Sequence, residues 1–203
     1  MINVHVGDVL TLGRYPQGED GSVCPIEWIV LATQEERALV LSRYVLDYQP
    51  YHSEAAVVRW ENSALRRWLN GEFVDRAFTE EELEMICIPE EEDDPMGDFL
   101  WQMFRMETAT SAIADRVFLL STADIAQYFP SENSLFCPGA SCKGTAYAEA
   151  LVESDLCWWL RSSMSEYPAA YIVSPVNSVG VSAADEDNCN GVRPAMWVRI
   201  DSE

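Results

Sequence analysis

The chain has 203 residues, of which 48% are hydrophobic and 23% are charged, a composition typical of a globular domain and not of a disordered or collagen-like chain. It carries 34 acidic and 13 basic side chains, a formal net charge of -21, so we expect neither nucleic acid nor a membrane as a partner. It contains no apolar stretch of about 18 residues and no basic start of a signal peptide, which predicts a soluble, cytoplasmic protein.

The first 45 residues predict β-structure. Apolar clusters at residues 9–12, 26–31 and 39–41 are separated by the turn-rich segment PQGEDGS and by a charged turn. This spacing is typical of a three-stranded β-meander.

Two short helices are predicted after the meander. Residues 60–71 have an amphipathic pattern, which we expect to begin at Asn62 or Ser63 as N-cap and to end at Gly71. Thr79, followed three residues later by a glutamate, has the spacing of a capping box and predicts the start of a second helix.

An acidic segment interrupts this pattern and predicts an insertion at residues 88–114. The sequence PEEEDDP is too charged to be buried and predicts a solvated loop, without the alternating acids and glycine of a calcium loop. Residues 96–106 then place aromatic and methionine side chains at helical spacing. We expect this stripe either to pack in the core or to dock a partner.

The rest of the chain predicts a strand at residues 117–120, a helix capped by Ser121 and Asp124, and a second sheet. Residues 131–156 are rich in turn signals and predict a surface excursion with one short helix at 147–152. Four apolar segments predict the antiparallel sheet, at residues 158–160, 170–173, 179–181 and 192–200. The predicted fold class is α+β, with residues 1–203 forming a single mixed domain.

Recognisable catalytic patterns are few. The chain has two histidines, His5 and His52, and neither lies near a nucleophile motif. GxSxG, HExxH, CxxC and a glycine-rich phosphate loop do not occur in the sequence.

The six cysteines are scattered, which favours free thiols over a disulfide framework in a chain of this length. Four of them could form a zinc site, but the two-residue spacing of a zinc knuckle is missing and no histidine lies nearby. We therefore expect no metal and no cofactor. The four cysteines are Cys137, Cys142, Cys157 and Cys189.

The most specific patterns are ordered motifs along the chain: GDVLTLGRYPQ, PIEWIVL, WENSALRRWLN, DRVFLLS, CWWLRSSMSEYPAAYIV and NGVRPAMWVRI. Together they resemble an uncharacterised bacterial domain family, common in gut anaerobes, whose members carry GRYPQ, PIEW, WENSxLRxWLN, VFLLS, WWLRSPG and GVRPALWL. The resemblance spans nearly the whole chain and departs from the family at residues 88–114 and 131–156.

The end of the chain also looks like the C-type-lectin-like architecture of formylglycine-generating enzymes and of hypervariable bacterial binding proteins. This resemblance implies a C-type-lectin-like scaffold. If Arg193 matches the arginine of that family's last strand, Cys189 falls where those enzymes carry the first of two copper-binding cysteines, and Pro194 falls at the second. Because one thiol cannot form a two-sulfur site, the sequence argues against oxidase chemistry.

The last two motifs carry the predicted ligand site. Adjacent residues of a strand point to opposite faces, so one of Trp158 and Trp159 can fill the core while the other stands towards the loops. Pro194 cannot donate to a central ladder, so we expect an edge or a bulge there, which would open a concave surface. The predicted ligand-binding residues are Trp159, Arg161, Tyr171, Asn190 and Arg193.

The two arginines of this set have an alternative role. In an acidic protein, Arg161 and Arg193 could instead form internal ion pairs with a carboxylate such as Glu27, Glu61 or Asp47.

Three functions remain open from the sequence. The first is a soluble, non-enzymatic module that binds a small ligand, a glycan or a protein. The second is a hydrolase-type enzyme whose site, with His52 and carboxylates, is assembled only in the fold. The third is a structural or assembly role that uses residues 96–106 as a docking helix.

Overall fold

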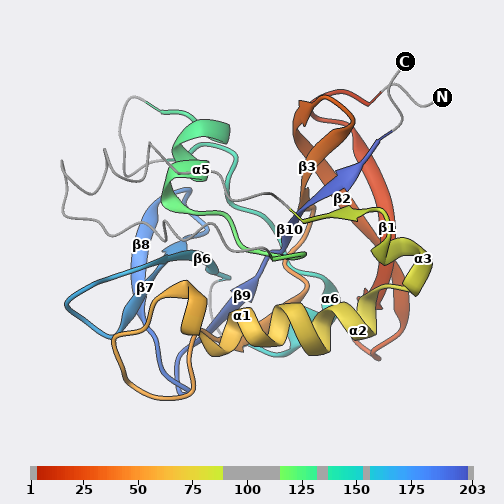
Figure 1. The fold of residues 1–203 in the computed structure, drawn as a ribbon. Helices are drawn as coiled ribbons and strands as arrows, with labels where there is room; N and C mark the ends of the chain where they lie inside the picture. The colour runs from red at the N-terminus through yellow and green to blue at the C-terminus, as the bar shows by residue number, and fades with distance from the viewer. Residues whose placement is uncertain (1–3, 89–114, 132–136, 153–155, 201–203) are drawn as a thin grey trace.

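A computed structural model describes residues 4–88, 115–131, 137–152 and 156–200. These residues form ten strands in two five-stranded sheets, with short helices between them (Figure 1). The α+β class is therefore confirmed. The predicted insertion lies outside the described residues, apart from residue 88, and so does the stripe at 96–106.

The predicted N-terminal meander is confirmed and forms most of the first sheet, sheet I. Strands β1 (Val9–Pro16), β2 (Val23–Gln34) and β3 (Arg37–Ser42) pair antiparallel in chain order. Strands β10 (Ala195–Arg199) and β5 (Ile86–Cys87) complete the order β1-β2-β3-β10-β5.

The second sheet, sheet II, has the order β4-β9-β6-β7-β8. Its neighbouring strands are antiparallel except for β6 and β9, which pair in parallel through Trp158 and Gly191. A Cβ at Gly191 would lie 2.8 Å from the Cys157 carbonyl oxygen, so only glycine allows this close approach. The strands are β4 (Asp47–Pro50), β6 (Trp158–Ser163), β7 (Ala169–Val173), β8 (Val179–Ala183) and β9 (Cys189–Val192).

The prediction of one strand over residues 192–200 is wrong. The chain leaves sheet II after β9 and enters sheet I as β10, and Pro194 lies in the two-residue crossover. The prediction that this last strand lies at a sheet edge is also wrong, because β10 lies between β3 and β5. The crossover needs no N–H from Pro194, while its carbonyl accepts the Ser42 N–H at 2.8 Å.

The first predicted helix is longer than expected. Ser63 is its N-cap, as predicted, and its Oγ accepts the Arg66 N–H. The helix does not end at Gly71, because a π-turn carries the chain on to Ala77 and keeps Phe73 in the core. Burial of these apolar residues outweighs the cost of about 1 kcal/mol for glycine inside a helix. The segments are η1 (Trp60–Asn62), α1 (Ala64–Trp68), η2 (Leu69–Phe73) and α2 (Val74–Ala77).

The two predicted capping boxes are present, at the starts of α3 (Glu80–Leu83) and α5 (Thr122–Tyr128). The predicted strand at 117–120 is only a bridge from Phe118 to Ala195. The segment 131–156 contains the short helix α6 (Ala146–Ala150), but it is not wholly at the surface, since Cys137, Ala140 and Ala148 are buried in the part that the structure describes.

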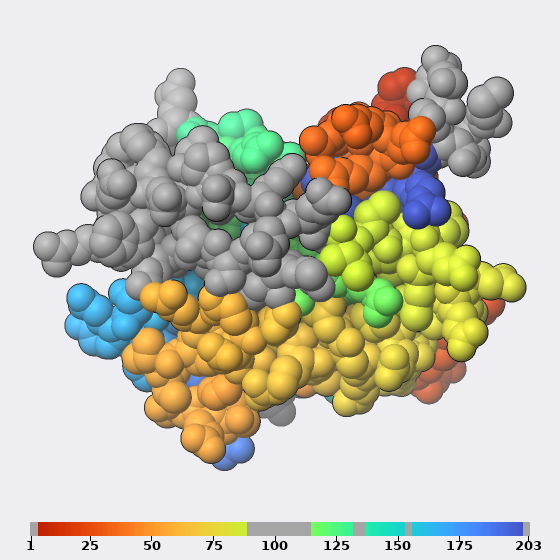
Figure 2. All heavy atoms as spheres, in the orientation of Figure 1, coloured from red at the N-terminus to blue at the C-terminus, as the bar shows by residue number. Residues whose placement is uncertain are grey.

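Both sheets contribute to one apolar core, which includes Trp28 from sheet I, Trp158 and Trp159 from sheet II and Trp60 from η1. Burying each such aromatic side chain contributes about 2–3 kcal/mol. Figure 2 shows the helical run α1–α2 as part of a continuous orange-to-yellow band across the lower part of the molecule. Among the described residues, no helix is both long enough and apolar enough to cross a membrane.

Candidate functional site

A groove with a volume of about 560 Å³ lies against sheet I, beside the connection from α3 to β5. Its floor is formed by side chains of four neighbouring strands. Leu10 pairs with Trp28, and Val40 pairs with Met196, so these residues share one face of the sheet. Ligand sites in proteins have volumes of about 300–1,000 Å³ and mostly apolar walls, so the size of this groove fits a small ligand.

The solvent-exposed surface of the groove comes from the residues of its walls and not from those of its floor. Trp28, Val40 and Met196 are buried under the floor, whereas Val9 and Met85 are 46% and 45% exposed. The rest of the lining comprises Val4, Thr11, Leu12, Val198, Arg199 and Ile200. Apart from Thr11 and Arg199, the lining residues that the structure describes are apolar.

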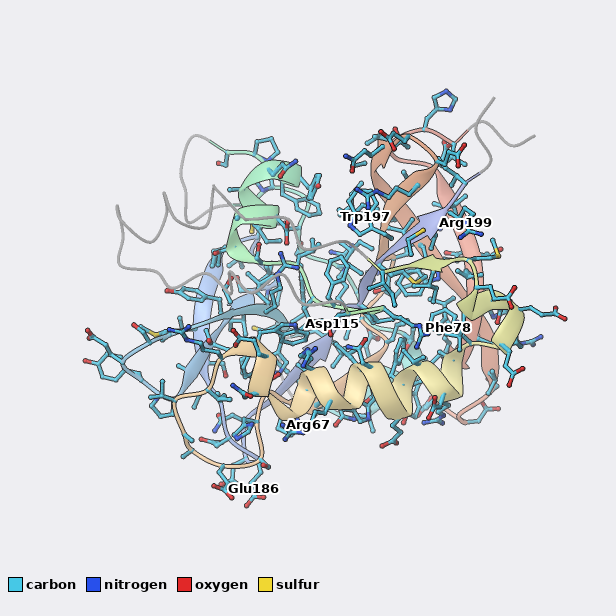
Figure 3. All side chains as sticks on the ribbon, viewed as in Figure 1. Arg67, Phe78, Asp115, Glu186, Trp197 and Arg199 are labelled. Atoms are coloured by element: carbon cyan, nitrogen blue, oxygen red, sulfur yellow. The ribbon has the colours of Figure 1, made fainter. Side chains whose placement is uncertain are left out.

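Among the described residues of the lining, Arg199 is the one that is ionisable, and it is exposed. In the β10–β3 ladder it lies directly opposite Arg37. The Arg37 guanidinium is held by the Gln34 side chain at 2.9 Å and lies 4.9 Å from the ring centre of Trp197. Figure 3 shows Trp197 and Arg199 at the same end of sheet I. Since successive residues of a strand point to opposite faces, Arg37, Trp197 and Arg199 lie on the face of the sheet opposite to Val40 and Met196, and the floor of the groove is apolar.

The structure places the five predicted ligand residues in sheet II and in the crossover, away from this groove. Arg193 is buried, and its guanidinium donates to the carbonyl oxygens of Ser42 at 2.9 Å and Ala140 at 2.8 Å. It also lies 5.2 Å from the ring centre of Trp158. Arg193 thus joins the end of β3, the segment around Ala140 and sheet II.

Burial lowers the pKa of the Arg193 guanidinium. Burial also raises the pKa of the neighbouring Cys142 thiol, against the opposing effect of Arg193, so this thiol offers no thiolate partner. Arg193 forms no ion pair with any residue in the described ranges, so the predicted carboxylate partner is not found there.

Trp159 and Asn190 are also buried, which differs from the concave surface that we predicted. The indole N–H of Trp159 donates to the Gln49 carbonyl oxygen at 2.8 Å, and the Asn190 amide donates to Ser182 Oγ at 3.0 Å. Trp158 is buried as well, so neither indole of the pair stands towards the loops. The structure brings these side chains into the interior, where they support the sheet.

Arg161 and Tyr171 reach solvent in part. The Arg161 guanidinium lies 3.1 Å from Asp124 and 5.4 Å from the ring centre of Phe118. This ion pair agrees with the alternative role for Arg161, although the partner is not one of the three carboxylates that we named. The ligand-binding role of all five residues stays a prediction.

His52 has a structural contact. Its Nδ1 accepts the backbone N–H of Ala64, the first residue of α1, at 3.2 Å. A nitrogen that accepts this hydrogen bond is not free to take a proton from a substrate. Neither histidine belongs to a cluster of metal-ligating side chains, since the described residues contain no group of three or more His, Cys, Asp or Glu that could hold a metal ion.

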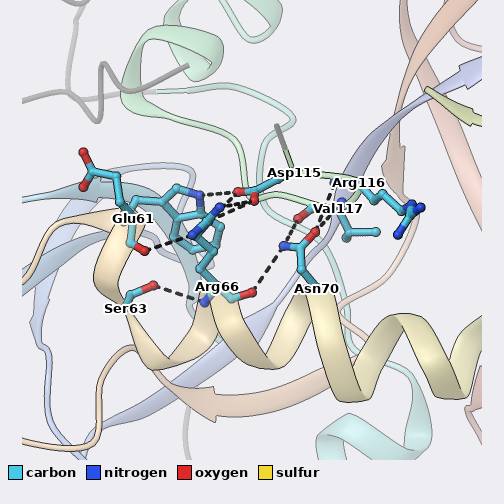
Figure 4. A network of polar contacts seen from close by, with 8 residues as sticks. Glu61, Ser63, Arg66, Asn70, Asp115, Arg116 and Val117 are labelled. Atoms are coloured by element: carbon cyan, nitrogen blue, oxygen red, sulfur yellow. Dashed lines mark hydrogen bonds and ion pairs between the residues drawn. The ribbon is translucent and has the colours of Figure 1, made fainter. Parts of the chain in front are cut away.

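The sequence analysis missed a buried polar network between the helical run and residues 115–117 (Figure 4). Asp115 accepts the Trp60 indole N–H at 2.9 Å and both Nε and Nη2 of Arg66 at 2.8 Å. The Asn70 side chain pairs with the backbone of residues 116 and 117 as a strand would. The signal that could have indicated it is the WENSALRRWLN motif, whose polar residues recur at helical spacing.

Comparison with known proteins agrees with the motif pattern. A family model described as "Domain of unknown function (DUF6273)" matches residues 35–200, from the β2–β3 turn to the end of β10. The chain belongs to this family. No curated protein and no solved structure matches it.

The DUF6273 match contains the Asp115 network and the Arg193 crossover, while β1 and β2 precede it. One wall of the groove, residues 9–12 of β1, therefore lies outside the matched range, and the β10 side lies inside it.

Proposed function

We propose that this protein is a non-enzymatic binding module on a C-type-lectin-like scaffold, and that its ligand is a small, largely apolar molecule held in the groove of sheet I. The observation that carries the proposal is the groove itself, with a volume of about 560 Å³ and, within the described part of the chain, only Thr11 and Arg199 as polar lining residues. Such a lining favours a small apolar ligand over a glycan, because a sugar needs many hydrogen-bonding groups.

Other parts of the proposal have separate support. The scaffold is supported by the sequence of β9 and β10, which carries the resemblance to C-type-lectin-like domains. All six cysteines are free thiols, which supports a soluble protein in the reducing cytoplasm. For the predicted set of C-terminal ligand residues, partial exposure supports a contact role at Arg161 and Tyr171.

Binding of the neutral dye Nile red to the intact protein tests this function. We expect saturable, one-to-one binding with blue-shifted emission, as in other apolar environments. Met85→Trp places an indole in the groove and should weaken the dye by about tenfold, since overpacking costs about 1–3 kcal/mol. Val176→Trp is the matched control, because Val176 lies 71% exposed in the turn between β7 and β8 and does not line the groove.

Two results would contradict the proposal. One is a linear, unsaturable increase of dye fluorescence in the wild type. The other is equal weakening by Met85→Trp and Val176→Trp, which would place the dye away from the groove.

A further inference from the structure

We propose that the ligand of this groove is a short extended peptide segment of a partner protein, apolar at every second position and basic at its ends, which pairs antiparallel with the free edge of β1. This inference rests on the proposed function and names the chemical class of the ligand. Three observations carry it: the unpaired main chain of β1, the apolar groove along it and the acidic surroundings.

Strand β1 is the outermost strand of sheet I, so one of its two edges has no partner strand (Figure 1). The Asp8 carbonyl accepts the Val30 N–H at 2.9 Å, which places that main-chain group on the side of β2. Because the main-chain groups alternate sides along an antiparallel strand, those of Leu10 also face β2, and those of Val9 and Thr11 face outward. Within the described ranges these outward groups have no hydrogen-bond partner, so two N–H donors and two carbonyl acceptors are available.

The free edge of β1 has a defined end and coincides with the groove. The Gly13 N–H donates to Glu82 Oε1 at 3.0 Å, so a side chain of α3 occupies the edge at that residue. The stretch from Val9 to Leu12 precedes this contact, and all four of its residues line the groove. Successive side chains point to opposite faces, so a groove that touches four consecutive residues runs along the main chain of the edge. A strand added to β1 would therefore lie in the groove.

The groove determines which side chains such a strand needs. Residues directly opposite each other in neighbouring strands share a face, so the added residue opposite Leu10 points to the floor with Trp28 and Met196. The residues opposite Val9 and Thr11 point to the other face, where both of those side chains are exposed. The partner should therefore be apolar at every second position, as in other complexes that form by strand addition.

The charge of the surroundings favours a basic partner. Three exposed glutamates lie in α3 and at its C-terminal end, beside the edge: Glu80, Glu81 and Glu84. The whole chain has a formal net charge of -21. A second copy of the chain would bring the same negative charge to the edge, whereas a peptide with basic ends is attracted to it. The charge therefore favours a cationic peptide over self-association through β1.

Fluorescence anisotropy with the labelled, end-capped peptide KVTVTVK tests the inference. Its valines are placed to face the groove, and its two threonines are placed to pair with Val9 and Thr11. We expect saturable, one-to-one binding that displaces Nile red. The peptide EVTVTVE should bind about fivefold more weakly at low salt, which is the effect of one exposed ion pair, and higher salt should reduce the difference.

Two N-methylated versions of KVTVTVK separate strand pairing from simple burial of the valines. Methyl groups on the two threonine nitrogens remove the donors to β1 and should weaken binding by about tenfold or more. Methyl groups on the nitrogens of the first and last valines are the matched control, because these nitrogens point away from β1, and they should have a much smaller effect.

Thr11→Pro tests the same contact from the side of the protein, because it removes one outward N–H from an edge strand. It should weaken the binding of KVTVTVK by about tenfold. Val181→Pro is the matched control in β8, the outer strand of sheet II. The Ser178 carbonyl accepts the Ser174 N–H, so by the same alternation the main-chain groups of Val181 face the free edge of β8, and this variant should leave peptide binding unchanged. If Thr11→Pro does not fold in a urea titration, the methylated peptides decide the question on the wild type.

The outcomes separate the two proposals. If neither Nile red nor a peptide binds, the proposed function fails. If Nile red binds but KVTVTVK does not displace it, or if the two methylated peptides bind equally or in the opposite order, strand pairing is refuted while the proposed function stands. Equal binding of EVTVTVE refutes the basic partner. A dimer in analytical ultracentrifugation that Thr11→Pro dissociates would assign the edge to a second copy and overturn the inference.

Discussion

Replacing Asp115 by alanine should destabilise the protein far more than any exposed substitution. Its side chain is 4% exposed and binds the Arg66 guanidinium, which is 28% exposed, and the indole N–H of Trp60. Without the carboxylate, a buried indole donor and a partly buried cation lose their acceptor (Figure 4). The motif WENSALRRWLN thus supplies both side chains, Trp60 and Arg66, that donate to Asp115.

The size of the effect follows from these contacts. Removing one partner of a buried ion pair costs about 3–5 kcal/mol. Because water reaches part of Arg66, we take the lower end of this range, about 3 kcal/mol. Asp115→Asn keeps one acceptor oxygen but replaces the other by an NH2 donor that faces the N–H groups of Arg66 or Trp60, so it should cost about 2 kcal/mol.

Urea unfolding followed by circular dichroism measures these differences. With a slope of about 3 kcal/mol/M, Asp115→Ala should lower the midpoint by about 1 M at an unchanged slope. Arg116→Ala is the neighbouring control, since this side chain is exposed and only its backbone N–H binds Asn70, and it should cost less than about 0.5 kcal/mol.

A double-mutant cycle with Arg66→Met shows whether the pair itself is responsible. The two substitutions should be coupled by about 1–3 kcal/mol, because each already removes the same ion pair. A loss below about 1 kcal/mol for Asp115→Ala, or additive effects in the cycle, would refute the reasoning.

Two further predictions concern the interior. Arg193→Lys should lower stability by about 2–3 kcal/mol in urea unfolding, because the single nitrogen of a lysine cannot occupy the positions of both Nε, which binds Ser42, and Nη1, which binds Ala140. Nile red binding should not change, and weaker binding at unchanged stability would instead assign Arg193 to a ligand site. Burial raises the pKa of the Tyr51 phenol, so with rising pH this phenol ionises in the unfolded chain before it ionises in the folded protein. The contribution of Tyr51 to the free energy of unfolding is therefore present below about pH 10 and falls above it by about 1.4 kcal/mol per pH unit. Urea midpoints from pH 8 to 11 should fall less steeply in Tyr51→Phe, and identical slopes would contradict this prediction.

Local patterns predicted much of the fold. The meander, the Ser63 N-cap and the capping boxes at Thr79 and Ser121 depend on residues close in the chain, and all are present. Gly71 was misjudged because its local preference opposes the burial of Phe73, which only tertiary packing reveals. Pro194 indicated a break in the ladder, but periodicity could not show that the chain changes sheets there.

The candidate site was harder to predict because its parts are distant in sequence. The groove joins residues of β1, Met85 and the end of β10, which no short motif connects. The sequence analysis instead placed the site at the most distinctive residues, mainly the tryptophans and arginines of the last two motifs. Trp159, Asn190 and Arg193 are distinctive because large or polar side chains in the interior need particular partners.

The motifs therefore fall into two groups with different physical roles. One group forms buried hydrogen bonds between distant parts of the chain, and it comprises the motifs at residues 60–70 and 115–121 and the Arg193 crossover. Because the polar groups of these motifs are already paired, they have little freedom to bind a ligand. The first and last strands are different, because β1 and β10 present mostly apolar side chains to the groove, and one of these, Val9, is 46% exposed. An exposed apolar surface of this kind is the part of the fold that a purely structural role explains least, and it is the surface to which our proposal assigns the ligand.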